Sequence, residues 1–66
     1  MKDFIQAHRL KTGNTVLIAI SDISMVIGYK DNTSKLFLKS DPVNELSLRE
    51  SIDMVTNLIK EAYGQE

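Results

Sequence analysis

The sequence predicts a small α+β domain, with an antiparallel sheet of about four strands, the second of them bent, and one C-terminal amphipathic helix packed on it. The stretch Thr15–Ile27 is the most apolar in the chain, and its β-branched side chains alternate with a period of two, as in strands. Residues 51–63 instead repeat apolar side chains at spacings of three and four, which is typical of a helix. With 66 residues and no cysteine, we expect residues 1–66 to form a single domain with a small core.

The central stretch changes parity after Ile20. Three apolar residues alternate before that point and three after it, but the step from Ile20 to Ile23 is odd. A straight strand would therefore send the second set to the opposite face. A bend or bulge at Ser21-Asp22 would return both sets to one core. We predict strands 15–20 and 23–28 that meet at a corner near residues 21–23, with these inward residues: Val16, Ile18, Ile20, Ile23, Met25 and Ile27.

Three further strands are predicted, over residues 4–10, 35–39 and 45–48. Gly13 and Asn14 tolerate positive φ and indicate a tight hairpin between the first strand and the central stretch. Pro42 indicates a turn over residues 40–44, because proline cannot donate to a sheet ladder. The side chains expected to form the sheet half of the core are Val16, Ile18, Ile20, Leu36, Leu38, Leu46 and Leu48.

The helix is predicted over residues 51–63. Ser51 at the N-cap, followed by Asp53 in the first turn, suits the positive end of the helix dipole. Ser47 and Glu50 form a competing capping box, which would start the helix earlier and remove the last strand. We favour Ser51, because the alternation of Leu46 and Leu48 then serves a strand. The predicted apolar stripe comprises Ile52, Val55, Leu58, Ile59 and Ala62.

One helix covers only one face of a sheet, and the other face also contains apolar residues. An antiparallel sheet with one face in water normally has polar residues there. We therefore predict a second apolar surface through which the chain forms homo-oligomers, most simply a two-fold dimer. The alternative is a scatter of single apolar residues on the surface, which is normal in monomeric proteins. The residues expected at this interface are Leu17, Ala19, Val26, Phe37 and Met54.

Basic residues collect in the strand half of the chain. Residues 1–40 carry six Lys or Arg against three Asp or Glu, whereas residues 41–66 carry two against six. Basic side chains on the strands and turns that contact phosphates would form a nucleic-acid-binding surface. Tyr29 and Phe37 are near enough to these residues in sequence to stack on bases. Because the net charge is −1, a solvated charged rim is the simpler interpretation. The cations concerned are Lys2, Arg9, Lys11, Lys30, Lys35 and Lys39.

Catalytic and metal signatures are lacking in the sequence. His8 is the one histidine and has no neighbouring carboxylate in sequence, so we expect an exposed strand residue. Asp22 and Asp41 stand where turn chemistry explains them. The sequence has no glycine-rich phosphate loop and no nucleophile elbow. We predict a protein that is not an enzyme and that uses no cofactor or metal.

Targeting features are also lacking in the sequence. No run approaches the roughly 18 apolar residues of a membrane-spanning helix. The first ten residues do not have the pattern of a signal peptide. The chain is therefore expected in the cytoplasm, without a membrane partner.

The order of these features resembles the small bacterial flagellar proteins of the FlbD type. The corresponding pieces are the Gly13-Asn14 turn, the apolar strand Val16–Ile20, the Asp22-Ile23 corner, the short strand Leu36–Leu38 and the Leu48–Ser51 entry to the helix. The pattern covers nearly the whole chain, and the Asp41-Pro42 turn departs from it. The resemblance implies the hairpin-plus-helix fold, with a more distant similarity to the longer DNA-binding modules of the LytTR type, and no ligand residue follows from it.

We therefore expect a small interaction module that associates with itself and docks a larger protein through an exposed edge strand. The alternative is a nucleic-acid-binding accessory or regulatory protein that uses the basic strand and turn residues.

Overall fold

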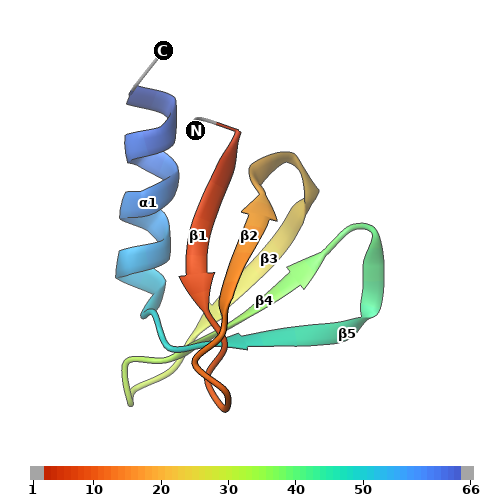
Figure 1. Ribbon diagram of the computed structural model, residues 1–66, viewed down its shortest axis with the longest axis vertical. Coiled ribbons are helices and arrows are strands. Elements are labelled where there is room, and N and C mark those ends of the chain that lie inside the picture. Colours follow the sequence, from red (N-terminus) through yellow and green to blue (C-terminus); the bar gives the residue numbers. More distant parts are fainter. Residues whose placement is uncertain (1–2, 65–66) are drawn as a thin grey trace.

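Five antiparallel strands and a C-terminal helix make up the chain in the computed structural model, which describes residues 3–64 (Figure 1). The predicted α+β class is confirmed. The bent second strand counts as two strands, β2 and β3, which are separated by a short 3₁₀ turn. The elements in order are β1 (Phe4–His8), β2 (Thr15–Ala19), η1 (Ile20–Asp22), β3 (Ile23–Gly28), β4 (Ser34–Leu38), β5 (Asp41–Leu48) and α1 (Ile52–Gly64).

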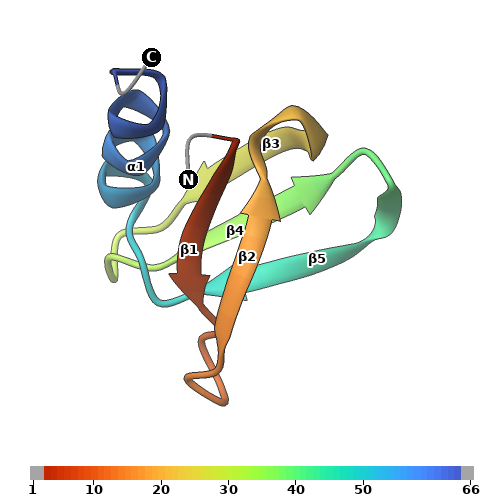
Figure 2. The ribbon, with the colours of Figure 1, turned by 45° about the horizontal axis from the view of Figure 1, so that its top comes forward.

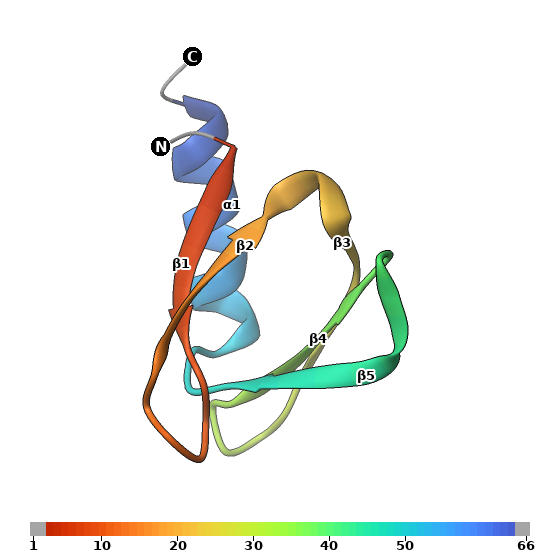
Figure 3. The same ribbon diagram turned by 45° about the vertical axis from the view of Figure 1, so that its right-hand side comes forward.

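The strands form two sheets that meet at the η1 bend and at a second corner, beside Arg9 and Leu48. β1 pairs with β2, and β3, β4 and β5 form a three-stranded meander in that order. An isolated bridge between Arg9 and Leu48 joins the sheets, and the Arg49 amide donates to the His8 carbonyl at 2.9 Å. Between these two corners the sheets separate (Figures 2 and 3). The helix α1 packs beside β1 and the far end of β3, on the opposite flank from the β4–β5 turn (Figure 1).

The corner in the central stretch lies where it was predicted, at η1. The carboxylate of Asp22 accepts hydrogen bonds from the amide and hydroxyl of Ser40, and its carbonyl accepts from the Lys39 amide at 2.7 Å. These bonds hold the corner against the β4–β5 turn. Short polar residues at a sharp bend have this role.

Beyond the corner the predicted alternation is only partly right. Ile23 packs against the core, but the pairing register shifts between Ile23 and Met25. Because β3 contains one extra residue at this point, the side chains that follow it point to the opposite faces from those that simple alternation predicts. Met25 and Ile27 are therefore exposed, and Val26 packs inward. The predictions for these three side chains were wrong.

The last strand begins earlier than predicted. β5 starts at Asp41, so Pro42 lies inside the strand rather than in a turn over residues 40–44. Asp41 pairs with Leu38 and Glu45 pairs with Phe37, so residues 42–44 have no partner in β4. An irregular segment of this kind tolerates a residue that lacks an amide hydrogen. The pairing between β4 and β5 also shifts register after Phe37, next to the tight turn.

The core lies between the two sheets and the helix. All seven predicted sheet residues are buried or packed against the core, and Ile5 and Ala7 of β1 join them. From the helix, Val55 and Ala62 are buried, and Leu58 and Ile59 are partly buried against the core. The hydroxyl of Ser51 accepts a hydrogen bond from the Met54 amide at 3.2 Å, which confirms Ser51 as the N-cap.

Residues 3–64 contain no helix with both the length and the apolar character that crossing a membrane requires.

Candidate interaction surface

The outer face of the β1–β2 hairpin exposes apolar side chains. Leu17 is 59% exposed and Phe4 is 38% exposed, and Ala19 lies directly across from Phe4 in the pairing register. The inward residues Ile5, Ala7 and Ile18 are at most 4% exposed, so the two faces of this sheet are clearly distinct. An antiparallel sheet normally shows polar residues on its wet face, and this face departs from that rule around Leu17.

The same hairpin leaves one edge of β2 free. The Ile20 amide donates to the Asp3 carbonyl and the Arg9 amide donates to the Asn14 carbonyl. These two bonds show that the even-numbered residues of this strand direct their amide and carbonyl groups toward β1. Because hydrogen-bonded and non-hydrogen-bonded pairs alternate, the amide and carbonyl groups of Thr15, Leu17 and Ala19 point away from β1. Across residues 3–64, no other strand pairs with them.

A groove of about 360 Å³ runs along β2 toward the second sheet. Its lining is largely apolar, and Arg9 and Asp22 contribute charge. Inward-facing residues of both sheets line it, namely Val16, Ile18, Leu38 and Leu46. The groove lies between the Arg9–Leu48 bridge and the bend at η1, where no strand of one sheet pairs with a strand of the other within residues 3–64 (Figure 3).

The five residues predicted at the oligomer interface do not form one surface. Leu17 and Ala19 share the outer face of β2. Phe37 pairs with Met25, which is 50% exposed, in the other sheet, and Met54 is 54% exposed on α1. Val26 packs against the core and belongs to neither outer face. Phe4 was missed, because β1 was expected at an edge and its outer face was given no role.

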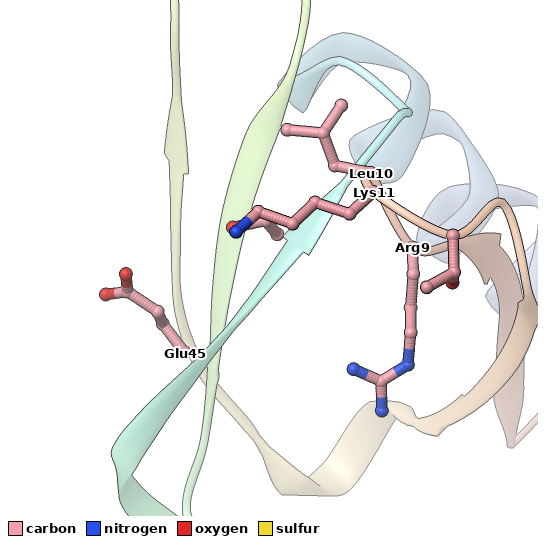
Figure 4. A pocket seen from close by; sticks show the side chains of 6 residues that line it. Arg9, Leu10, Lys11 and Glu45 are labelled. Carbon is pink, nitrogen blue, oxygen red and sulfur yellow. The ribbon is translucent and has the colours of Figure 1, made fainter.

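The basic residues are also dispersed. Arg9 and Lys11 line a hollow of about 350 Å³ with Glu45, and their side chains extend in different directions (Figure 4). The Lys35 ammonium lies 2.9 Å from a Glu45 carboxylate oxygen and 5.8 Å from the Tyr29 ring centre. The Glu45 carboxylate raises the pKa of Lys35. Lys30 and Lys39 lie in the turns at opposite ends of β4, and Lys2 lies outside the described residues.

His8 has a carboxylate partner that the sequence did not reveal. Its Nδ1 lies 2.7 Å from Glu50 Oε2, and its backbone amide donates to Glu50 Oε1 at 2.9 Å. Burial raises the pKa of Glu50, but the hydrogen bonds from the His8 ring and amide lower it by more, so the pKa lies below its ordinary value. The two residues are 42 positions apart, so no local pattern signals the pair.

This pair has a structural role. It fastens the end of β1 to the segment before α1, where the Ser34 hydroxyl also donates to the Glu50 carbonyl at 2.9 Å. Residues 3–64 contain no group of three side chains able to hold a metal ion. Asp22 and Asp41 have local structural roles: Asp22 accepts hydrogen bonds from Ser40, and Asp41 accepts hydrogen bonds from Asn44 across the unpaired first part of β5.

Comparison of the chain with protein-family models, with curated proteins and with solved structures found no match.

Proposed function

We propose that this chain is a small, non-enzymatic interaction module that forms homo-oligomers through the outer face of the β1–β2 hairpin. The observation that carries the proposal is the exposure of Leu17 beside Phe4 and Ala19 on a face that a monomer would be expected to make polar. A surface that brings such residues together is typical of a contact between chains.

The magnitudes indicate modest association. Two copies of Phe4 and Leu17, each about half exposed in the monomer, would contribute roughly 3–6 kcal/mol on burial. Association costs about 4 kcal/mol or more in lost translational and rotational freedom. The apolar face on its own therefore supports only a weak oligomer, and further contacts between copies are needed for a stable one.

Nucleic-acid binding is the second candidate, through Arg9, Lys11, Lys30, Lys35 and Lys39. We rank it lower because Lys35 pairs with Glu45 and the other four cations are divided among three connections: Arg9 and Lys11 lie between β1 and β2, Lys30 lies between β3 and β4, and Lys39 lies between β4 and β5. Fluorescence anisotropy with duplex and single-stranded DNA at low salt tests this candidate. Binding that weakens steeply as salt is added would favour it over the first.

Sedimentation velocity over micromolar to millimolar protein concentration tests the first proposal. We expect the mass to rise with concentration for the native chain, and to stay monomeric for Leu17→Lys, which places charge in the centre of the face. Val43→Lys is the matched control, since Val43 is an exposed apolar residue on β5, 86% exposed. A native chain that is monomeric throughout would contradict the proposal, as would an oligomer that Val43→Lys abolishes and Leu17→Lys leaves intact.

A further inference from the structure

We infer that β2 pairs edge to edge with β2 of a second copy, antiparallel, with Leu17 on the two-fold axis. The inference rests on the proposed homo-oligomer and specifies its contact: the copies join at the edge of β2, so that of the outer-face residues Leu17 lies at the contact and Phe4, one strand away on β1, remains exposed. The free amide and carbonyl groups of Thr15, Leu17 and Ala19 would then find partners across the axis. The result would be a continuous four-stranded sheet in the order β1-β2-β2-β1.

The other free edges of the fold carry features that oppose pairing. The first part of β5 contains Pro42, which has no amide hydrogen to donate, and it is flanked by the acidic residues Asp41 and Glu45. β3 is bulged near Ser24, and its end packs against α1 through Gly28 and Ile52. Prolines, charges, bulges and covering helices are the usual means of blocking an edge strand.

β2 has none of these features. Its sequence Thr-Val-Leu-Ile-Ala contains no proline and no charged residue, and all five of its residues pair with β1 without a register shift. An open, regular, apolar edge is a template for pairing with another strand. Since the edges of β3 and β5 carry features that block pairing, the edge of β2 is the one that can pair with a strand of another chain.

One register uses the whole strand. Antiparallel pairing requires that residues with outward amides face each other, so the odd-numbered residues of β2 must pair with odd-numbered residues. Full overlap of Thr15–Ala19 then places Leu17 opposite Leu17 and Thr15 opposite Ala19. This register also brings the Leu17 side chains of the two copies opposite each other on the outer face, one strand away from Phe4.

The charges at the two ends of β2 are complementary in this arrangement. Near Thr15 lie Arg9, Lys11 and Arg49, whose guanidinium lies against Gly13, and one acidic residue, Glu45, which lines the same hollow as Arg9 and Lys11. Near Ala19 lie Asp3 and Asp22, together with Lys39, whose amide bonds to Asp22. An antiparallel pair brings the basic end of each copy to the acidic end of the other, twice. A second copy therefore suits this edge in charge as well as in hydrogen bonding.

Ala19→Pro tests the edge without changing the outer face. Ala19 has φ −68° and ψ 125°, which proline adopts readily, and its amide does not bond to β1. The variant should fold as the native chain does but lose one donor per copy and place its ring against the approaching strand. We expect the dissociation constant of the dimer to rise about tenfold or more. Ala19→Ser, which keeps the amide hydrogen, should dimerise like the native chain.

Amide hydrogen exchange followed by NMR supplies a second measurement on the native chain. Raising the protein concentration should slow the exchange of Thr15, Leu17 and Ala19, whereas the exchange of Val16 and Ile18, already bonded to β1, should change little. A dimer whose odd-numbered amides stay fast, or one that a folded Ala19→Pro variant leaves intact, would overturn edge pairing while the proposed homo-oligomer stands. A native chain that stays monomeric would overturn both.

Discussion

β2 and β3 are consecutive parts of one apolar stretch, yet their surroundings differ. β2 pairs in an unbroken register with β1 and leaves its other edge open. β3 shifts register after Ile23 and ends against α1. Apolar content alone therefore does not determine how a strand is used, because the corner at η1 and the position of the helix decide which edge is covered.

The largest effect should come from charge on the inner face of β2. Ile18 is 4% exposed, and Ile18→Asp would bury a carboxylate at a cost of more than about 4 kcal/mol. A domain of this length has a free energy of unfolding of roughly 3–10 kcal/mol, so we expect loss of the native fold in circular dichroism. Leu17→Asp, on the next residue and the opposite face, should remain folded. Equal unfolding by both variants would contradict the distinction between the two faces of β2.

The next effect concerns the contact between β3 and the helix. A Cβ on Gly28 would lie 2.6 Å from Ile52 Cγ2 and 2.8 Å from Ile52 Cβ, so the start of α1 would have to move. We expect Gly28→Ala to lower the free energy of unfolding by about 1–3 kcal/mol in urea denaturation. Adding Ile52→Ala should recover part of this loss. If the two substitutions are simply additive, the contact does not limit the position of the helix.

A smaller effect should follow from the pair that joins β1 to the helix entry. Glu50→Gln keeps the shape of the side chain but removes its charge, and we expect a loss of about 1 kcal/mol near neutral pH. Because folding lowers the pKa of Glu50 below its ordinary value of 4.5, its contribution is present above that pH and is lost as pH falls through the lower, folded value.

Denaturation of both proteins across acidic pH isolates this contribution. The native chain should lose stability more steeply below about pH 4.5 than Glu50→Gln, because the other carboxylates titrate in both. Asp31, whose pKa is lowered by hydrogen bonds from Thr33, is one such shared group. Parallel curves for the two proteins would mean that the His8–Glu50 hydrogen bonds do not stabilise the fold.

Local patterns were sufficient to predict most of the fold. Alternation identified the inward residues of β2, β4 and the end of β5, and a serine followed by an apolar stripe identified the start of α1. The outward turn of Met25 and Ile27 was missed, because a single bulged residue inverts a strand and leaves no compositional mark. Pro42 was assigned to a turn because a proline is found in a strand only at an unpaired edge position. Which positions are unpaired depends on how β4 and β5 pair, which the local sequence does not show.

The candidate surface was predictable only in part. Leu17 and Ala19 follow from the surplus of apolar residues in the central stretch. The position of Phe4 beside them follows from the pairing register of β1 and β2. The edge of β2 is open because β4 ends at Leu38, opposite β3, and does not continue alongside β2. The pairing of His8 with Glu50 joins residues that only the closed fold brings together.

The junction between the two sheets has a consequence for synthesis of the chain. The hairpin of β1 and β2 and the meander of β3, β4 and β5 each consist of contacts between near neighbours, but His8 and Arg49 meet only when almost the whole chain is present. Contacts that join distant residues slow folding, because the intervening loop must close before they form. We therefore expect the two sheets to stay apart during synthesis until Arg49 has left the ribosome. During that interval the inner face of the hairpin, with Ile5 and Ile18, is exposed to solvent in addition to the edge of β2.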